Sequence, residues 1–132
     1  MIKKLITAFI ATVIFALIMA AWSYVPVDER AENVYYESFF GMFVIFMIYS
    51  LPVYLLGGIP ASYAIDKIAS KKSYWLHFIL YAIAGALVGY IYLFVMNAHN
   101  QIIVGLFISA SVAASLIYFH VSFIIAKLFP KT

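Results

Sequence analysis

Four long apolar stretches without a single charged residue constrain this chain more than any other feature. They cover about residues 5–24, 38–58, 74–96 and 102–126, and short polar segments separate them. About 20 residues of α-helix cross the ~30 Å hydrocarbon core of a bilayer, where backbone N–H and C=O groups have no water to bond. The sequence therefore predicts an all-α integral membrane four-helix bundle that forms a single domain over residues 1–132.

The composition excludes a water-soluble fold. Hydrophobic residues make up 67% of the chain and charged residues only 10%, whereas about a quarter of the residues in a typical soluble domain are charged. The chain has no cysteine, which excludes disulfides, thiolate nucleophiles and cysteine-based metal sites.

The distribution of charge predicts the direction in which the chain crosses the membrane. Seven of the eight basic residues would lie on one side: Lys3, Lys4, Lys67, Lys71, Lys72, Lys127 and Lys131. Arg30 and four of the five acidic residues fall in the segment 27–37 on the other side, and Asp66, the exception, is expected to pair with Lys3 or Lys4. Because basic residues are retained in the cytoplasm during insertion, both termini are predicted to be cytoplasmic, and the net charge of +3 requires no nucleic-acid partner.

The first apolar stretch has a second interpretation as a signal peptide. Met1–Lys4 resembles a basic leading region, and Ile18-Met19-Ala20 could serve as a cleavage site. An apolar stretch of about 20 residues is longer than the usual 7–15 residues of a signal peptide, so an uncleaved span is favoured.

Small residues recur at helical spacing and predict where the spans pack. Close backbone approach matters because lipid provides no hydrophobic drive for helix association. The predicted packing residues are Ala8, Thr12, Ala16 and Ala20 in the first span, Gly85 and Gly89 in the third, and Ser111, Ser115 and Ser122 in the fourth. The glycine pair fits packing within the bundle, which is favoured, or a homodimer face.

The fourth span carries two stripes of small or polar residues. Tyr118 lies with the serines, and Ser109, Ala113 and His120 lie on the opposite side of the helix. Two such faces predict a helix packed between two neighbours.

The second span contains four residues that bend helices: Pro52, Gly57, Gly58 and Pro60. Proline removes a backbone donor and clashes with the preceding turn, and paired glycines let the chain bend. We expect a kink or a break at Gly57–Pro60, followed by a short interfacial helix from Pro60 to about Lys71. The alternative is one kinked and tilted helix. Broken helices line substrate sites in many transporters, although a purely structural role is favoured here.

No constellation for catalysis or for metal binding is visible in the sequence. Charged residues inside membrane spans normally mark ion paths or catalysis, and these spans have none. His120, close to Tyr118, could accept a proton or bind a cation, but a neutral imidazole bonded to a serine or tyrosine of a neighbouring helix is favoured. The three histidines lack ligand spacing, so the sequence predicts no catalytic residue, cofactor or metal.

The stretch Tyr49-Ser50-Leu51-Pro52-Val53-Tyr54-Leu55-Leu56-Gly57-Gly58-Ile59-Pro60-Ala61-Ser62-Tyr63-Ala64-Ile65-Asp66 resembles a family of small four-span membrane proteins of Bacillus-type bacteria. Its most specific residues are Pro52, Gly58, Pro60 and Asp66. The resemblance implies a bacterial plasma-membrane protein and brings no assigned activity.

Taken together, these features favour a non-enzymatic membrane protein that acts by binding a membrane partner, a peptide or a lipid. A homo-oligomer is compatible with the small-residue stripes. The alternative is a small transporter or channel that uses the Gly57–Pro60 segment and His120.

Overall fold

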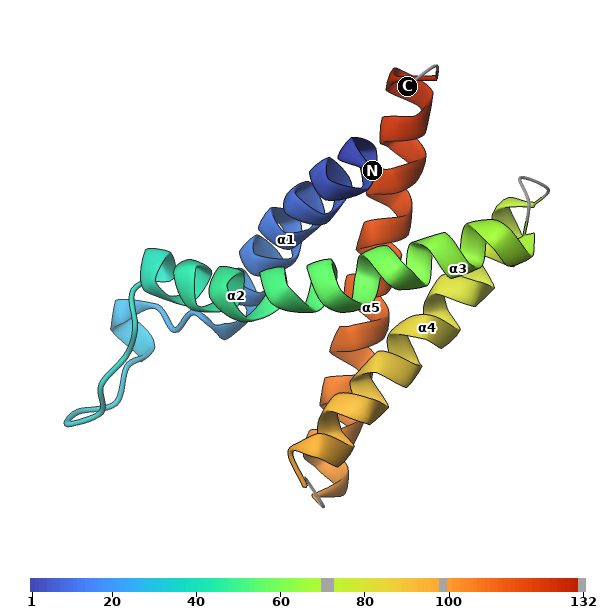
Figure 1. Cartoon of the computed structure of the whole chain (residues 1–132). Coiled ribbons are helices and arrows are strands. Elements are labelled where there is room, and N and C mark those ends of the chain that lie inside the picture. Colours follow the sequence, from blue (N-terminus) through green and yellow to red (C-terminus); the bar gives the residue numbers. More distant parts are fainter. Residues whose placement is uncertain (70–72, 98–99, 131–132) are drawn as a thin grey trace.

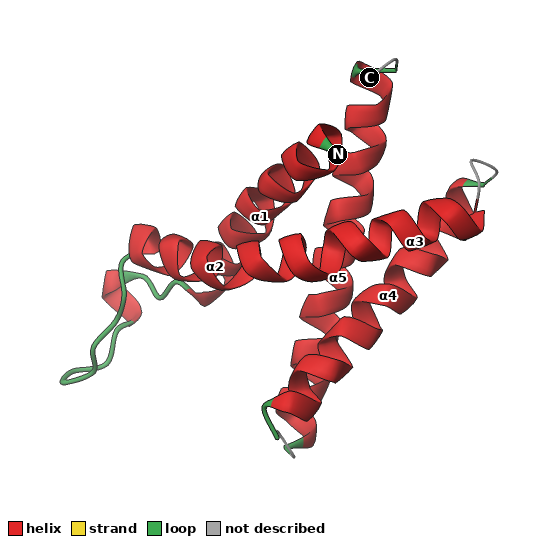
Figure 2. Ribbon diagram, viewed as in Figure 1, coloured by secondary structure: helices red, strands yellow, loops and turns green. Residues whose placement is uncertain are grey.

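The computed structural model describes residues 1–69, 73–97 and 100–130 (Figure 1). Its elements are α1 (Ile2–Ser23), the 3-10 turn η1 (Val27–Glu29), α2 (Phe39–Val53), the π-helical segment η2 (Tyr54–Gly58), α3 (Ile59–Ala69), α4 (Tyr74–Val95) and α5 (Gln101–Leu128). Everything that is regular in the described ranges is helical (Figure 2). Four helices, with α2, η2 and α3 counted as one, are long and apolar enough to cross a membrane, which confirms the predicted fold class.

Polar side chains determine where two of the helices begin. The Ser38 hydroxyl accepts a hydrogen bond from the backbone N–H of Gly41 at 3.0 Å, and the Asn100 side chain accepts one from the N–H of Ile102 at 3.0 Å. Such caps satisfy N–H groups that have no partner in the first turn. Beyond the end of α4, Asn97 takes a left-handed conformation with φ of 54°, which asparagine tolerates better than most residues.

The second span is one continuous helix from Phe39 to Ala69. It does not stop at Gly57–Pro60, so the expected break with a separate interfacial helix is wrong, and of the alternative, one kinked and tilted helix, the single helix is confirmed. The irregularity is the π-helical segment η2, in which the N–H of Ile59 bonds to the carbonyl of Tyr54. Pro60 follows at once and lacks the N–H that would bond to Leu56. Widening the turn by one residue keeps the helix continuous at this point.

The helices form two pairs that cross each other. In Figure 1, α2 and α3 run as one rod across α1 and α5, and α4 packs along α5. The buried core lies where the pairs meet, and it includes Ala8, Tyr54, Ile65, Tyr81 and Tyr118. Towards the α1–α2 loop and the α4–α5 turn the two pairs diverge (Figure 1).

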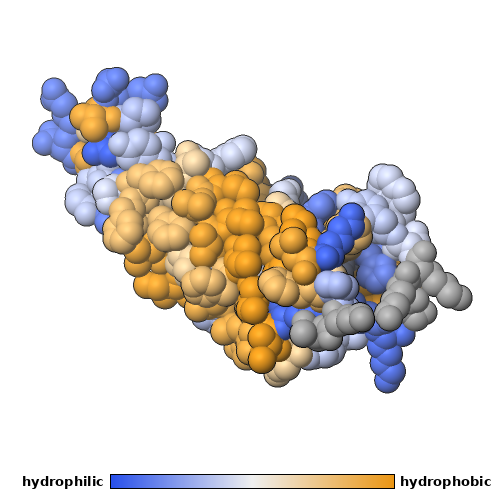
Figure 3. All heavy atoms as spheres, turned by 90° about the horizontal axis from the view of Figure 1, so that it is seen from above, coloured by the Kyte–Doolittle hydropathy of each residue, from blue (hydrophilic) through white to orange (hydrophobic). Residues whose placement is uncertain are grey.

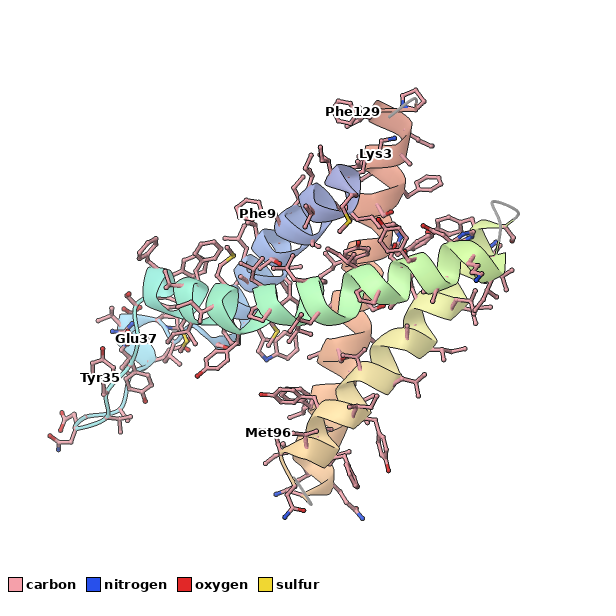
Figure 4. All side chains as sticks on the ribbon, in the orientation of Figure 1. Lys3, Phe9, Tyr35, Glu37, Met96 and Phe129 are labelled. Carbon is pink, nitrogen blue, oxygen red and sulfur yellow. The ribbon has the colours of Figure 1, made fainter. Side chains whose placement is uncertain are left out.

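Both termini lie at the same end of the bundle (Figure 1). The ammonium group of Lys3 donates to the carbonyl of Phe129, next to which it lies in Figure 4, and Lys4 forms a salt bridge with Asp66 at 2.6 Å. The salt bridge confirms the pairing expected for Asp66. We call this end of the molecule, which carries Lys3, Lys4 and Asp66, the basic end.

The surface has the polarity of a membrane protein. Figure 3 shows a hydrophobic band across the middle of the molecule with hydrophilic residues at its two ends. Large side chains such as Phe40, Ile48, Leu56 and Phe94 are exposed on the helices. These residues would contact acyl chains, because lipid is the solvent of this band.

A lateral groove and a buried polar cluster

The tightest helix contact joins α4 and α5 through what we call the serine-glycine seam: Gly85, Gly89, Ser111 and Ser115. A Cβ atom added to Gly85 would lie 2.6 Å from Cβ of Ser115 and 2.8 Å from the carbonyl oxygen of Ser111. One added to Gly89 would lie 2.8 Å from Cβ of Ser111. The predicted glycine face therefore packs within the chain and is not free to bind a second copy.

Hydrogen bonds reinforce the serine-glycine seam. The Ser111 hydroxyl donates to the carbonyl of Gly85 at 2.6 Å, and the Ser115 hydroxyl donates to the carbonyl of Tyr81. Hydrogen bonds between membrane helices contribute about 0.6 kcal/mol each on average. The seam therefore combines close packing with polar contacts that lipid cannot replace.

The small residues of α1 form a second packing face. Ala8, Thr12, Ala16 and Ala20 are all completely buried, and α1 packs against both α2 and α5. The Thr12 hydroxyl donates to the carbonyl of Ala8 at 2.7 Å within the same helix, so it leaves no polar group unsatisfied in the core.

Between the two helix pairs lies a cavity of about 910 Å³, which we call the lateral groove. All four spans contribute to it, with Phe15 and Met19 from α1, Ile45 and Tyr49 from α2, Val88, Tyr92 and Met96 from α4, and Phe107 and Ala110 from α5. Ile48, which also lines the groove, is 63% exposed, so the groove is open at the surface of the hydrophobic band. Its volume is in the range of small-molecule sites, about 300–1,000 Å³.

The inner end of the lateral groove is formed by aromatic rings. Tyr54 stacks on Tyr118 with ring centroids 6.0 Å apart, and Phe15 meets Tyr54 edge to face at 6.3 Å. The Tyr54 hydroxyl donates to the carbonyl of Ala114 at 2.7 Å, which ties the π-helical segment to α5. Gly58 lies against both rings, since a Cβ atom there would be 3.4 Å from Tyr54 and 3.6 Å from Tyr118.

Most hydroxyl groups of the lateral groove are bonded within the protein. Ser50 donates to the carbonyl of Phe46 at 2.5 Å, and those of Tyr54, Ser111 and Ser115 are bonded as described above. Two further tyrosines of the groove, Tyr49 and Tyr92, have hydroxyls with no partner in the described part of the chain. A ligand would therefore meet an apolar wall with a few polar groups.

A buried polar cluster lies beyond the tyrosines, towards the basic end. Ser62, which is completely buried, accepts a hydrogen bond from the Tyr81 hydroxyl at 2.9 Å and one from the Lys4 ammonium at 2.6 Å. The Lys4 ammonium also pairs with Asp66, whose side chain is 54% exposed. This cluster links α1, α3 and α4 in a layer that closes the inner end of the groove.

The Tyr118 hydroxyl is the exception in this layer. The side chain is 1% exposed, and within residues 1–69, 73–97 and 100–130 its hydroxyl has no hydrogen-bond partner. An unsatisfied buried hydroxyl costs about 1–3 kcal/mol. The structure therefore places Tyr118 inside the core, where it does not meet His120.

His120 lies on the exposed side of α5. Its Nδ1 donates to the carbonyl of Leu116 at 2.7 Å, and its Nε2 is hydrogen-bonded to the Tyr74 hydroxyl at 2.9 Å. The ring is therefore bonded to a tyrosine of a neighbouring helix, which is the arrangement favoured from the sequence. The span has the two neighbours expected from the sequence, since α5 packs against both α4 and α1. Ser109 and Ala113 are exposed on the same side as His120, so this second stripe is not one of the packing faces.

The four predicted bending residues take different places in the second span. Gly57 and Gly58 lie inside the π-helical segment and line the lateral groove, Pro52 lies one turn before them, and Pro60 stands just after them at the start of α3. Ser122 lies apart from the serine-glycine seam, in a second cavity at the basic end.

Three residues of the site were not predicted as such from the sequence: Tyr54, Ser62 and Tyr81. Their only sequence signal is a polar group inside an apolar span.

In the described ranges, no group of three or more histidine, aspartate or glutamate side chains is arranged to hold a metal ion.

No family model, curated protein or solved structure gives a significant match to this chain. What is established is thus a four-span membrane protein with a lateral groove, and the resemblance to a bacterial family stays a prediction.

Proposed function

We propose that this protein is a non-enzymatic lipid-binding protein of the bacterial plasma membrane. Its lateral groove would take an acyl chain, or a similarly apolar molecule, sideways from the bilayer. The observation that carries the proposal is the groove itself, about 910 Å³ in volume and open at the hydrophobic band between two diverging helix pairs.

The side chains that α2 presents to the groove favour a lipid over a partner helix. Close association of membrane helices depends on small residues, whereas Ile45, Ile48 and Tyr49 are large. An acyl chain is thinner and flexible, and the wall that it would meet is apolar. Tyr49 and Tyr92 would provide hydroxyls for the more polar part of the ligand.

The experiment that tests this function uses a photoactivatable phospholipid. Phosphatidylglycerol with a diazirine at the end of one acyl chain is irradiated in liposomes that contain the protein, and the adducts are located by mass spectrometry. We expect adducts to concentrate on groove residues such as Tyr49, Val88 and Phe107. Equal labelling of the groove and of outward-facing residues such as Leu87 and Phe94 would refute a specific site.

Two tryptophan variants of α4 make a matched pair for the same experiment. Val88 lines the lateral groove, and Leu87 beside it is 56% exposed and outside the groove. Val88→Trp should fill the groove and remove the groove adducts, while Leu87→Trp should leave them unchanged. A protein that co-purifies in equal amount with both variants would instead indicate a partner on another surface.

The alternative function, a small transporter, is favoured by one observation. Two cavities at opposite ends of the bundle are separated by the layer of Ser62, Tyr81 and Tyr118. His120 would not take part, because it lies on the exposed side of α5. Purified protein in liposomes should then move ions or a dye faster than empty vesicles do, and His120→Ala should leave that flux unchanged.

We further propose that the basic end is cytoplasmic. The seven lysines predicted for one side outnumber the single acidic side chain, Asp66, that shares it, and an excess of lysine and arginine is typical of cytoplasmic segments. The lateral groove would then open in the outer half of the membrane. The bilayer is the expected partner, and the exposed small-residue side of α5 leaves room for a homo-oligomer.

A further inference from the structure

A second cavity, of about 1,110 Å³, opens at the basic end of the bundle. We call it the basic-end cavity. Its walls come from the first turns of α1, from α3, from the start of α4 and from the last turns of α5. It shares no lining residue with the lateral groove, so an inference about it is independent of the proposed function.

Cationic and apolar side chains line the basic-end cavity together. Ile6 and Ile125 belong to the apolar part of the wall. The polar groups come from Lys3, Lys4, Thr7, Tyr63, Asp66, His77 and Ser122, and the carboxylate of Asp66 is paired with Lys4. Two lysines beside isoleucine side chains are suited to an amphipathic anion, whose charge and hydrocarbon would lie against different parts of one wall.

The hydrogen bonds of the two lysines leave donors for a ligand. A lysine ammonium has three N–H donors. In the described residues, Lys4 uses two of them, on Ser62 and Asp66, and Lys3 uses one, on the carbonyl of Phe129. The Lys4 ammonium also lies over the ring of Tyr63, 4.5 Å from its centroid, so the available donors are the two remaining on Lys3.

The electrostatics of the cavity favour an anion. Asp66 already neutralises Lys4, whereas no acidic side chain in the described part of the chain pairs with Lys3. The only acidic residues of the sequence other than Asp66 are Asp28, Glu29, Glu32 and Glu37, in the loop at the opposite end. The charge of Lys3 is therefore available to a bound anion.

We infer that the basic-end cavity binds the phosphate headgroup of an anionic phospholipid from the leaflet on that side of the membrane. Lys3 holds the phosphate with its two available donors, and the first part of an acyl chain lies against Ile6 and Ile125. Basic pockets between membrane helices are known to bind anionic headgroups in this manner. The apolar wall and the position at the end of the spans select a lipid over free phosphate.

The test is native mass spectrometry of the full chain in a non-ionic detergent. Short-chain phosphatidylglycerol is compared with phosphatidylcholine of identical chains, and inorganic phosphate is added as a competitor. We expect one phosphatidylglycerol to stay bound several-fold more strongly than phosphatidylcholine, and millimolar phosphate to leave it bound. Equal retention of both lipids would overturn the inference, and displacement by inorganic phosphate would indicate a site for the free ion instead.

Two lysine variants separate a site from general surface charge. Lys3→Gln should lower phosphatidylglycerol retention about fivefold, and Lys3→Arg should preserve it. Lys127→Gln is the control, because Lys127 carries the same charge near the end of α5 and is not part of the cavity. Its ammonium lies over the ring of Phe123, 4.6 Å from the centroid. Equal losses in Lys3→Gln and Lys127→Gln would contradict the inference.

Two further controls keep the result interpretable. Thermal unfolding of each variant shows whether the fold is retained, and Lys3→Arg serves as the comparison if Lys3→Gln does not fold. Val88→Trp, which fills the lateral groove, should leave the preference for phosphatidylglycerol over phosphatidylcholine unchanged, because the headgroup site is the basic-end cavity. Loss of that preference in the variant would mean that the selective site lies in the groove, and the inference about the cavity would be wrong.

Discussion

The α4–α5 pair and the α2 segment are both strongly apolar, yet they pack in opposite ways. At the serine-glycine seam the two backbones are so close that a single added methyl group at Gly85 would lie 2.6 Å from Ser115. In α2, by contrast, Ser50 is the only buried residue of fifteen. Its larger side chains, among them Ile45 and Tyr49, face the lateral groove.

Apolarity therefore does not decide which membrane helices associate. An isoleucine side chain makes equally favourable contacts with lipid and with a neighbouring helix, so close packing and hydrogen bonds decide which helices associate. Small residues at the seam permit both. The large residues that α2 presents to the groove permit neither with α4 or α5, although α2 packs against α1, and the helix pairs separate into a groove that lipid can enter.

The largest effect is expected at the seam. Gly85→Ala should destabilise the protein by about 1–3 kcal/mol, because the new methyl group overlaps Ser115 and the Ser111 carbonyl, and overpacking has a cost of this size. The measurement is thermal or denaturant unfolding in detergent. Gly105→Ala is the matched control, since no atom lies within 4 Å of its added Cβ, and it should be neutral or stabilising. Similar losses of stability in both variants would contradict the close packing at Gly85.

A smaller effect is expected for the polar cluster that joins the two pairs at the basic end. Lys4→Met should reduce stability by about 1 kcal/mol, because it removes the bonds to Ser62 and Asp66, and the exposure of Asp66 keeps the contribution of the ion pair small. A double-mutant cycle with Asp66→Asn measures the coupling. A coupling of zero would show that the ion pair does not hold α1 and α3 together.

Two tyrosines of the same layer should respond differently to loss of the hydroxyl. Tyr81→Phe removes the donor to Ser62 and should destabilise by about 0.5–1 kcal/mol. Tyr118→Phe removes a hydroxyl without a partner in the described residues and should be neutral or stabilising. Unfolding measurements on both variants decide the matter, and a greater loss for Tyr118→Phe would reveal a partner of that hydroxyl.

The smallest effect is expected on the groove side. A Cβ atom at Gly57 would lie 3.8 Å from Val88, an ordinary contact. Gly57→Ala should therefore change stability by less than ~0.5 kcal/mol, unlike Gly85→Ala, when both are unfolded under the same conditions. A loss as large as that of Gly85→Ala would show that the π-helical segment needs glycine for its backbone.

The fold was predictable because the bilayer imposes its own length scale and its own demand for helices. The pairing of Asp66 with a lysine of the first span was also predictable, because few charged residues share that end. The course of the second span was harder to predict. Pro52, Gly57 and Pro60 mark an irregular region, but whether the helix stops or widens by one residue depends on Tyr54 and its contact with α5. The groove was not predictable, because it depends on the angle between two helix pairs that no local pattern encodes.

Cysteine accessibility in intact cells tests directly whether the helices cross the membrane, because the sequence has no cysteine of its own that could be labelled. Single cysteines replace Glu32, Lys67 and Lys127 in turn, and a membrane-impermeant maleimide is added before or after permeabilisation. We expect labelling of the Glu32→Cys variant in intact cells and of the other two only after permeabilisation. Labelling of Glu32→Cys and Lys67→Cys from the same side would contradict a second helix that crosses the membrane between them.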